Sequence, residues 1–257
     1  MNYFFFTSSE DYDCRLTVPK FRADGGTRRG NQLICARIVN SSWDFKIAEA
    51  DEENDSFWYL DSGSFQQDDI FFIATAEELQ RQKHEGSLIE LNDFTHTDPA
   101  FRCNLAVSNS QGGWSSYQSE YPYRMIGKRG TIFSNIASLS NPEAKLNGCF
   151  LRNIFHQPII ESYRVLVFNA LTNDVLLETS ASSNQTNYIS FDTLPTEQGE
   201  LVLWAESFLG IPIYVSTDEL HNISMEHTHP PHESVHGSDR FALVGKLKGQ
   251  YDKKLAS

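Results

Sequence analysis

The stretch Tyr163-Arg-Val-Leu-Val-Phe-Asn169, followed after a short break by Val175-Leu-Leu-Glu-Thr179, decides the fold class. Both segments are short and mainly apolar, and their valine, aromatic and threonine residues suit the pleated, half-buried surface of a sheet. Between them lies Thr172-Asn173-Asp174, a run of residue types that favour tight turns. The stretch therefore predicts an antiparallel β-hairpin.

Segments of the same kind recur along the chain, and turn residues such as Asp24-Gly25-Gly26 separate them. They are residues 3–6, 33–39, 57–60, 70–74, 105–107, 123–126, 131–134, 149–154, 188–191, 200–205 and 211–215. In the second half of the chain they follow one another at the spacing of strands in a sandwich or barrel. The sequence therefore predicts a mainly β protein, sandwich or jelly-roll-like.

Two helices are expected within this β protein. Thr75-Ala-Glu-Glu78 has the capping-box pattern, so a short internal helix should begin after Thr75 and stop at Gly86. Ser238 can cap a C-terminal amphipathic helix, which we expect to pack on a sheet. Its apolar face would carry Phe241, Val244, Leu247, Tyr251 and Leu255.

The charge is concentrated in one part of the chain. The net charge is −13, and residues 44–98 hold 15 acidic residues against three basic ones. Such a surface repels phosphate backbones, which argues against nucleic-acid binding. It is either a solvated face or a docking surface for a basic partner.

A change in composition follows Asp98-Pro99, where acidic residues give way to aromatic and amide side chains. We therefore divide the chain into an acidic, β-rich N-terminal region at 1–98 and a β-sandwich region with the C-terminal helix at 99–257. These regions form either one domain or two.

The sequence predicts a cytoplasmic protein. Its first residues lack the basic start and long apolar run of a secretory signal, and no stretch approaches the ~18 apolar residues of a membrane span. The cysteines, Cys14, Cys35, Cys103 and Cys149, are scattered without a CxxC pair, so free thiols in a reducing compartment are expected.

Residues 226–233, the histidine cluster, are the chemically most unusual segment. If the chain is extended here, His227 and His229 share one face and continue the apolar stripe of Ile223 and Met225. Pro230 and Pro231 then bend the chain and bring back the residues that follow, His232 and Glu233. This pattern predicts a site for a divalent metal, zinc or iron, with His227, His229 and His232 or Glu233 as ligands.

The string His227-x-His229-x-x-x-Glu233 resembles the first metal-binding motif of the cupin family. Cupins have a glycine six positions before the first histidine, where this chain has His221, and a second motif downstream. Only 24 residues follow Glu233. The resemblance therefore implies a local, jelly-roll-like metal site and not the activities of that family. The alternatives are a proline-braced turn with a structural role and a metal-free acid–base or pH-responsive site.

A second candidate site lies between Trp114 and Arg124. Trp114, Tyr117, Glu120, Tyr121 and Arg124 combine aromatic rings with polar groups, which suits a saccharide. The alternative is that these aromatic side chains pack in the core.

The leading functional hypothesis is a metal-binding β protein that acts, if it is an enzyme, on a small polar or saccharide substrate. The alternatives are a non-catalytic carbohydrate- or protein-binding module and a structural subunit of an oligomer without metal. Neither a nucleic acid nor a membrane is an expected partner.

Overall fold

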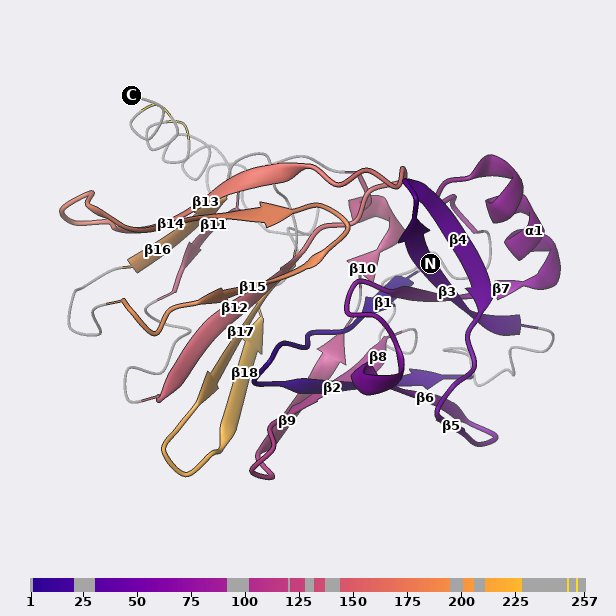
Figure 1. Cartoon of the computed structure of the whole chain (residues 1–257), viewed down its shortest axis with the longest axis horizontal. Coiled ribbons are helices and arrows are strands. Elements are labelled where there is room, and N and C mark those ends of the chain that lie inside the picture. The colour runs from indigo at the N-terminus through magenta and orange to yellow at the C-terminus, as the bar shows by residue number, and fades with distance from the viewer. Residues whose placement is uncertain are drawn as a thin grey trace, which may run out of the picture.

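The structure is a computed structural model that describes residues 2–20, 31–91, 102–119, 121–127, 132–136, 144–194, 201–205 and 211–227, with Gly249 and Lys253. This part of the chain is mainly β, as the sequence predicts, and its strands form four antiparallel sheets. Figure 1 shows two sheets on each side of the molecule. The predicted C-terminal helix lies almost entirely outside the described residues and stays a prediction.

The N-terminal lobe contains two five-stranded sheets. Its strands are β1 (Asn2–Phe5), β2 (Asp13–Pro19), β3 (Asn31–Val39), β4 (Ser42–Ile47), β5 (Glu52–Glu53), β6 (Phe57–Asp61), β7 (Ile70–Thr75), β8 (Cys103–Ser108), β9 (Trp114–Ser119) and β10 (Tyr121–Pro122). Sheet I has the order β10-β1-β7-β3-β4, and sheet II has the order β5-β6-β2-β8-β9. Phe4, Cys35 and Phe71 of sheet I share one buried core with Leu16 and Leu105 of sheet II.

The C-terminal lobe is a second sandwich, of two four-stranded sheets. Its strands are β11 (Ile132–Asn135), β12 (Leu146–Arg152), β13 (Ser162–Asn169), β14 (Val175–Ser182), β15 (Thr186–Ser190), β16 (Leu201–Ala205), β17 (Ile211–Thr217) and β18 (Ile223–His227). Sheet III has the order β11-β16-β13-β14, and sheet IV has the order β15-β12-β17-β18. Val165 and Leu203 of sheet III pack against Leu151 and Ile189 of sheet IV in the core of this lobe.

The hairpin predicted from residues 163–179 is confirmed. Strands β13 and β14 pair antiparallel from Ser162 opposite Ser182 to Phe168 opposite Val175. In the turn, Asn173 takes a positive φ of 62°, which asparagine tolerates better than most residues.

The internal helix α1 (Ala76–Glu85) is also confirmed, with the caps that the sequence predicts. Thr75 Oγ1 accepts from the Glu78 amide, and the Glu78 carboxylate accepts from the Thr75 amide. Gly86 ends the helix in the left-handed conformation, with φ 62°.

The predicted strand at residues 123–126 is wrong. Tyr123–Met125 is a 3₁₀ turn, η3, closed by a hydrogen bond from the Ile126 amide to the Tyr123 carbonyl. The preceding Pro122 has no amide hydrogen to donate, so pairing with β1 stops there. The apolar residues Met125 and Ile126 are buried in the core without pairing in a sheet, so the apolar character of residues 123–126 does not indicate a strand.

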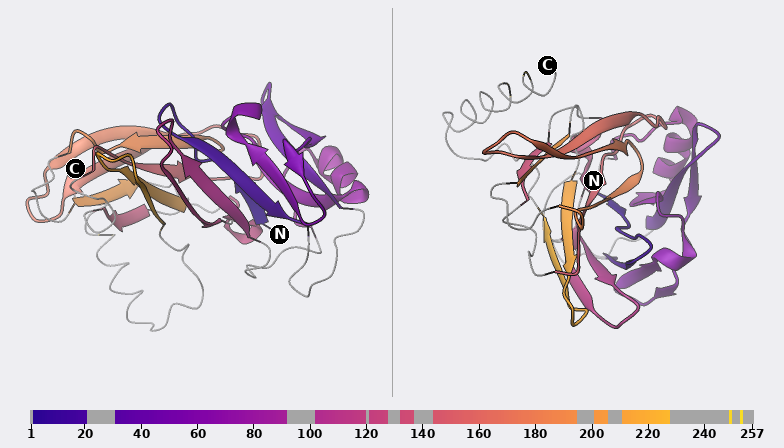
Figure 2. Two further views of the ribbon diagram at one scale, coloured as in Figure 1. Left: turned by 90° about the horizontal axis from the view of Figure 1, so that it is seen from below. Right: turned by 60° about the vertical axis from the view of Figure 1, so that its left-hand side comes forward.

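The two lobes are held together by buried contacts. In β12, Phe150 packs in the N-terminal core, whereas Cys149 and Leu151 pack between sheets III and IV, so one strand serves both cores. Tyr12 Oη lies 2.8 Å from Thr217 Oγ1 across the lobes. The change in composition at residue 98 lies outside the described residues. Figure 2 shows the lobes side by side from two further directions.

Candidate functional site

The Trp114 strand, β9, lies at one edge of sheet II and pairs with β8. Its side chains alternate between the two faces of the sheet, so Trp114, Ser116 and Gln118 lie on the solvent side. The Trp114 side chain is 67% exposed, which is unusual for so large an aromatic residue. Trp114 is therefore available to a ligand.

The next two aromatic residues of the segment face the interior. Tyr117 pairs opposite buried Leu105 and packs against the core, and its hydroxyl donates to Ser119 Oγ at 3.3 Å. Tyr121 is fully buried, and its oxygen accepts from the Ile154 amide at 3.2 Å. Burial raises the pKa of Tyr117 and raises that of Tyr121 to about 12, so both phenols stay neutral.

The remaining two predicted residues give less information. Glu120 lies outside the described residues. Arg124 lies in η3, at a point where the structure describes the backbone alone. The three aromatic residues predicted as ligand contacts are thus divided between one exposed ring, Trp114, and two interior rings, Tyr117 and Tyr121.

Trp114 belongs to a polar sheet surface, the outer face of sheet II. The strand register places Gln118, Asn104, Thr17 and Tyr59 directly opposite one another across four strands. Asn104 and Gln118 are exposed, and Thr17 and Tyr59 are half-buried. Strand geometry puts Trp114 about 13 Å from Gln118 along β9. This face thus offers one open aromatic ring beside a row of amide and hydroxyl groups.

The far end of this row is held by Arg15. Its guanidinium lies 5.0 Å from the centre of the Tyr59 ring and forms ion pairs with Glu52 at 3.2 Å and Asp61 at 3.7 Å. Asn54 Nδ2 donates to Tyr59 Oη at 3.2 Å. These contacts fix Tyr59, so Trp114 is the more open of these two rings.

The strand that leads into the histidine cluster lies beside β9. In β18, Ile223 is buried and Met225 packs against the core, whereas Ser224 and Glu226 are exposed, as the predicted alternation requires. Figures 1 and 2 show β18 alongside β9, and the two strands are in contact. Asn109 Nδ2 donates to the His221 carbonyl at 3.0 Å, which joins the two hairpins.

The histidine cluster itself lies almost entirely outside the described residues. The backbone of His227 pairs with Ile213 at the end of β18, and its side chain is not described. His229, His232 and Glu233 follow beyond the described part. Within the described residues, no three His, Cys, Asp or Glu side chains gather as metal ligands. That search does not reach the predicted ligands, so the metal site stays a prediction.

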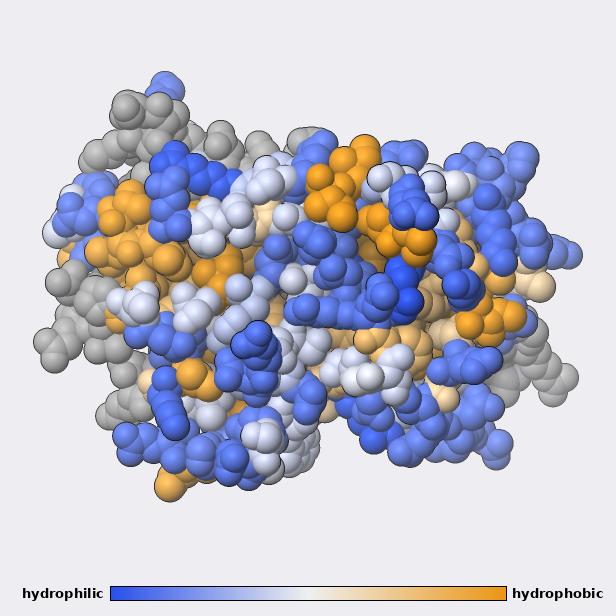
Figure 3. All heavy atoms as spheres, viewed as in Figure 1, coloured by the Kyte–Doolittle hydropathy of each residue, from blue (hydrophilic) through white to orange (hydrophobic). Residues whose placement is uncertain are grey.

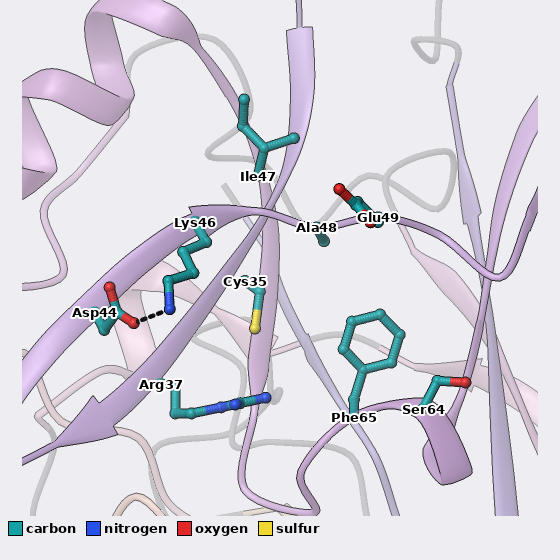
Figure 4. Close-up of a pocket in the computed structure, with 9 residues that line it drawn as sticks. All are labelled: Cys35, Arg37, Asp44, Lys46, Ile47, Ala48, Glu49, Ser64 and Phe65. Carbon is teal, nitrogen blue, oxygen red and sulfur yellow. Dashed lines mark ion pairs between the residues drawn. The ribbon is translucent and has the colours of Figure 1, made fainter.

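The structure also contains a cleft that the sequence does not reveal, the Arg37 cleft. It has a volume of about 290 Å³ and opens at the edge of sheet I, beside β3 and β4 (Figure 4). Nine residues line it: Cys35, Arg37, Asp44, Lys46, Ile47, Ala48, Glu49, Ser64 and Phe65. Four of these carry charges, two of each sign.

Arg37 is held in place by a buried carboxylate. Its Nε and Nη2 donate to the two carboxylate oxygens of Asp69 at 2.7 and 2.5 Å. The Asp69 side chain has 0% exposure, whereas that of Arg37 is 33% exposed toward solvent. The hydrogen bond to Asp69 raises the pKa of Arg37. Arg37 is therefore a permanently charged and rigidly placed donor.

Cys35 forms the floor of the cleft and is 8% exposed. Burial raises the pKa of its thiol to about 12. The thiol is therefore protonated at neutral pH, so Cys35 is an apolar surface here and not a nucleophile.

The sequence does not predict this cleft, because the acidic stretch is interpreted as a solvated face or a docking surface for a basic partner. Asp69 belongs to that stretch but is fully buried. Two signals could have identified the pair: Arg37 interrupts an apolar predicted strand, and Asp69 directly precedes another. Neither signal shows that the two strands are neighbours, as they are in sheet I.

Comparisons with known proteins give no relative. No family model, no curated protein and no solved structure matches this chain.

Within the described part of the chain, no helix is long and apolar enough to cross a membrane. Figure 3 shows that the face turned to the viewer is largely hydrophilic, with separate hydrophobic patches.

Proposed function

We propose that the protein is a carbohydrate-binding module that holds a saccharide on the outer face of sheet II. One observation carries the proposal: Trp114 is 67% exposed beside a solvent-accessible row of amide and hydroxyl side chains. An exposed ring without polar neighbours would suit an apolar partner instead. The combination of ring and polar groups favours a sugar.

The chemistry of the row matches that of sugar hydroxyls. The amides of Gln118 and Asn104 can each donate and accept, as can the hydroxyls of Ser116 and Thr17. Asn104 Nδ2 lies 3.5 Å from Ser116 Oγ, so these two side chains already meet over the sheet. An oligosaccharide that stacks the C–H surface of one pyranose on Trp114 would extend its further rings along β9 and place their hydroxyls over these groups.

A glycan array probed with the full chain tests the proposal. We expect binding to one or more saccharides, loss of that binding in Trp114→Ala, and a weaker signal in Gln118→Ala. Trp114 is exposed, so its replacement should leave the fold intact. Leu171→Ala is the matched control, because Leu171 is 71% exposed in the other lobe. Binding that survives Trp114→Ala unchanged would exclude this face.

The second candidate function is the metal site at His227, His229 and His232 or Glu233. The observation that favours it is the position of β18, which runs alongside β9 and ends at His227. A zinc or iron ion held there would lie at the end of the strand that neighbours the Trp114 strand. Three protein ligands would leave coordination positions open, as catalytic metal sites require, which would make the protein an enzyme for a small polar or saccharide substrate.

Elemental analysis of protein purified without a histidine tag tests this site. We expect about one equivalent of zinc or iron, lost in His227→Ala and kept in His84→Ala, since His84 is an exposed residue of α1. Retention should weaken below about pH 6, because imidazoles with a pKa near 6.5 then become protonated. Protein without stoichiometric metal would rule the site out.

A further inference from the structure

The Arg37 cleft has opposite charges on opposite sides. Figure 4 shows the Arg37 guanidinium extending below Cys35 toward the Phe65 ring, with Glu49 across the cleft. Lys46 Nζ pairs with Asp44 at 2.7 Å on a third side. Both basic groups already pair with carboxylates, Arg37 with Asp69 and Lys46 with Asp44, so a pure anion would gain little net attraction in the cleft. A pure cation would meet the two basic groups.

Between these charges lies a rigid apolar wall. The Phe65 ring packs edge-on against Phe71, with 5.1 Å between ring centres, and lies 6.0 Å from the centre of Phe6. Both partner rings are fully buried, so they hold Phe65 in position. The neutral Cys35 thiol and Ala48 continue this apolar surface.

We propose that the Arg37 cleft binds a small zwitterion with an apolar side chain, of the free α-amino acid type. The ligand's carboxylate would accept from Arg37 and Lys46, its ammonium group would face Glu49, and its side chain would pack on Phe65. A volume of about 290 Å³ suits a ligand of this size.

A neutral sugar fits the cleft less well. It would take four charged side chains partly out of water without supplying any opposing charge, which costs free energy. The proposal does not depend on saccharide binding at Trp114, because none of the cleft residues belongs to the outer face of sheet II.

Thermal unfolding and titration calorimetry of the full chain with L-leucine and L-phenylalanine test the proposal. We expect a rise in Tm that grows with ligand concentration, since binding to the folded state alone stabilises it. N-acetylleucine lacks the ammonium charge and leucinamide lacks the carboxylate. Each should bind at least about tenfold more weakly than leucine, the usual cost of losing one charge-assisted contact.

The most informative variant is Glu49→Gln, because Glu49 is exposed and its replacement does not threaten the fold. It should weaken leucine binding about tenfold, and Lys46→Met should act in the same direction. Glu219→Gln, an equally exposed acid in the β17–β18 turn, is the matched control and should change nothing.

Three results would overturn the proposal. One is that neither amino acid gives heat or a Tm shift at about 10 mM. Any affinity would then be weaker than a specific site provides. Another is binding of N-acetylleucine or leucinamide within about twofold of leucine, which would show that the charges do not matter. The third is leucine binding that Glu49→Gln leaves unchanged.

Discussion

The guanidinium of Arg152 is a charged group that is buried between the two lobes. Nη1 donates to Thr186 Oγ1 at 3.1 Å, and Nη2 donates to the Asp68 carbonyl at 2.8 Å. The Asp68 carboxylate lies 3.4 Å from Nη1 and also accepts from the Thr186 amide at 2.7 Å. Burial lowers the pKa of Arg152 to about 10, so these partners must offset a real desolvation cost.

Replacing Arg152 with leucine should therefore reduce the free energy of unfolding by about 3 kcal/mol, because it strips Thr186 and Asp68 of their partner at the lobe boundary. Urea denaturation measures this change. Arg164→Leu is the control, since the Arg164–Glu178 pair is largely exposed and should contribute less than about 1 kcal/mol. Equal effects of the two variants would show that burial of Arg152 is unimportant.

The buried thiols and phenols predict how stability depends on pH. Burial raises the pKa of Cys14, Cys35 and Tyr121 to about 12. Their contribution is complete below about pH 8, where both states are protonated, and is lost toward pH 12 as the unfolded chain ionises first. Arg152 acts in the opposite sense. As the pH rises, the folded protein loses the proton of Arg152 before the unfolded chain does, which removes a buried charge and raises stability.

We expect the three raised groups to outweigh Arg152, so the urea midpoint should fall between about pH 9 and pH 11. Cys35→Ala removes one of the groups and should make this fall shallower. A midpoint that stays constant or rises over this range would contradict the burial of these groups.

At the scale of elements, local sequence predicts those whose signals are complete within a few residues. The hairpin β13–β14 has its own turn, and α1 has both caps, so each is confirmed close to its predicted bounds. Strands β2, β4 and β9 were not predicted. Apolar residues alternate with polar ones in the short strands β2 and β4, whereas β9 is mostly polar and has only Trp114 and Tyr117 as apolar residues. For β9, the pairing with β8 and not its own composition shows that it is a strand.

Gly113 lies where the β8–β9 hairpin contacts the β17–β18 turn. A Cβ at this position would lie 1.8 Å from the His221 carbonyl oxygen, whereas Gly63 has nothing within 4 Å of its Cβ position. Gly113→Ala should therefore destabilise the protein by about 1–3 kcal/mol, as overpacking does, and Gly63→Ala should be close to neutral. Thermal unfolding compares the two. A neutral Gly113→Ala would mean that the hairpins do not meet.

Contacts over long sequence separations determine the rest of the molecule, and no local pattern reveals them. The partnership of Arg37 with Asp69 needs β3 beside β7, and the polar row beside Trp114 needs β6, β2, β8 and β9 in that order. Alternation along the strand could place Trp114 and Tyr117 on different faces of the sheet. It could not show which of the two faces is exposed to solvent. The candidate site was thus predictable as a segment and not as a surface.

Because β12 contributes to both cores, the two lobes should unfold together. Tryptophan fluorescence and far-UV circular dichroism should give coincident urea curves with one transition. Buried Trp43 reports on the N-terminal lobe and buried Trp204 on the C-terminal lobe, so Trp43→Phe and Trp204→Phe variants separate the signals. Two transitions at different urea concentrations would show that the lobes are independent.

The most direct measurement for the proposed function is the NMR signal of the Trp114 indole N–H, assigned by its absence in Trp114→Phe. Saccharides that bind on the glycan array should shift this signal in a saturable way and leave those of the interior Trp43 and Trp204 in place. A Trp114 signal that stays constant while the saccharide binds would contradict binding on the outer face of sheet II.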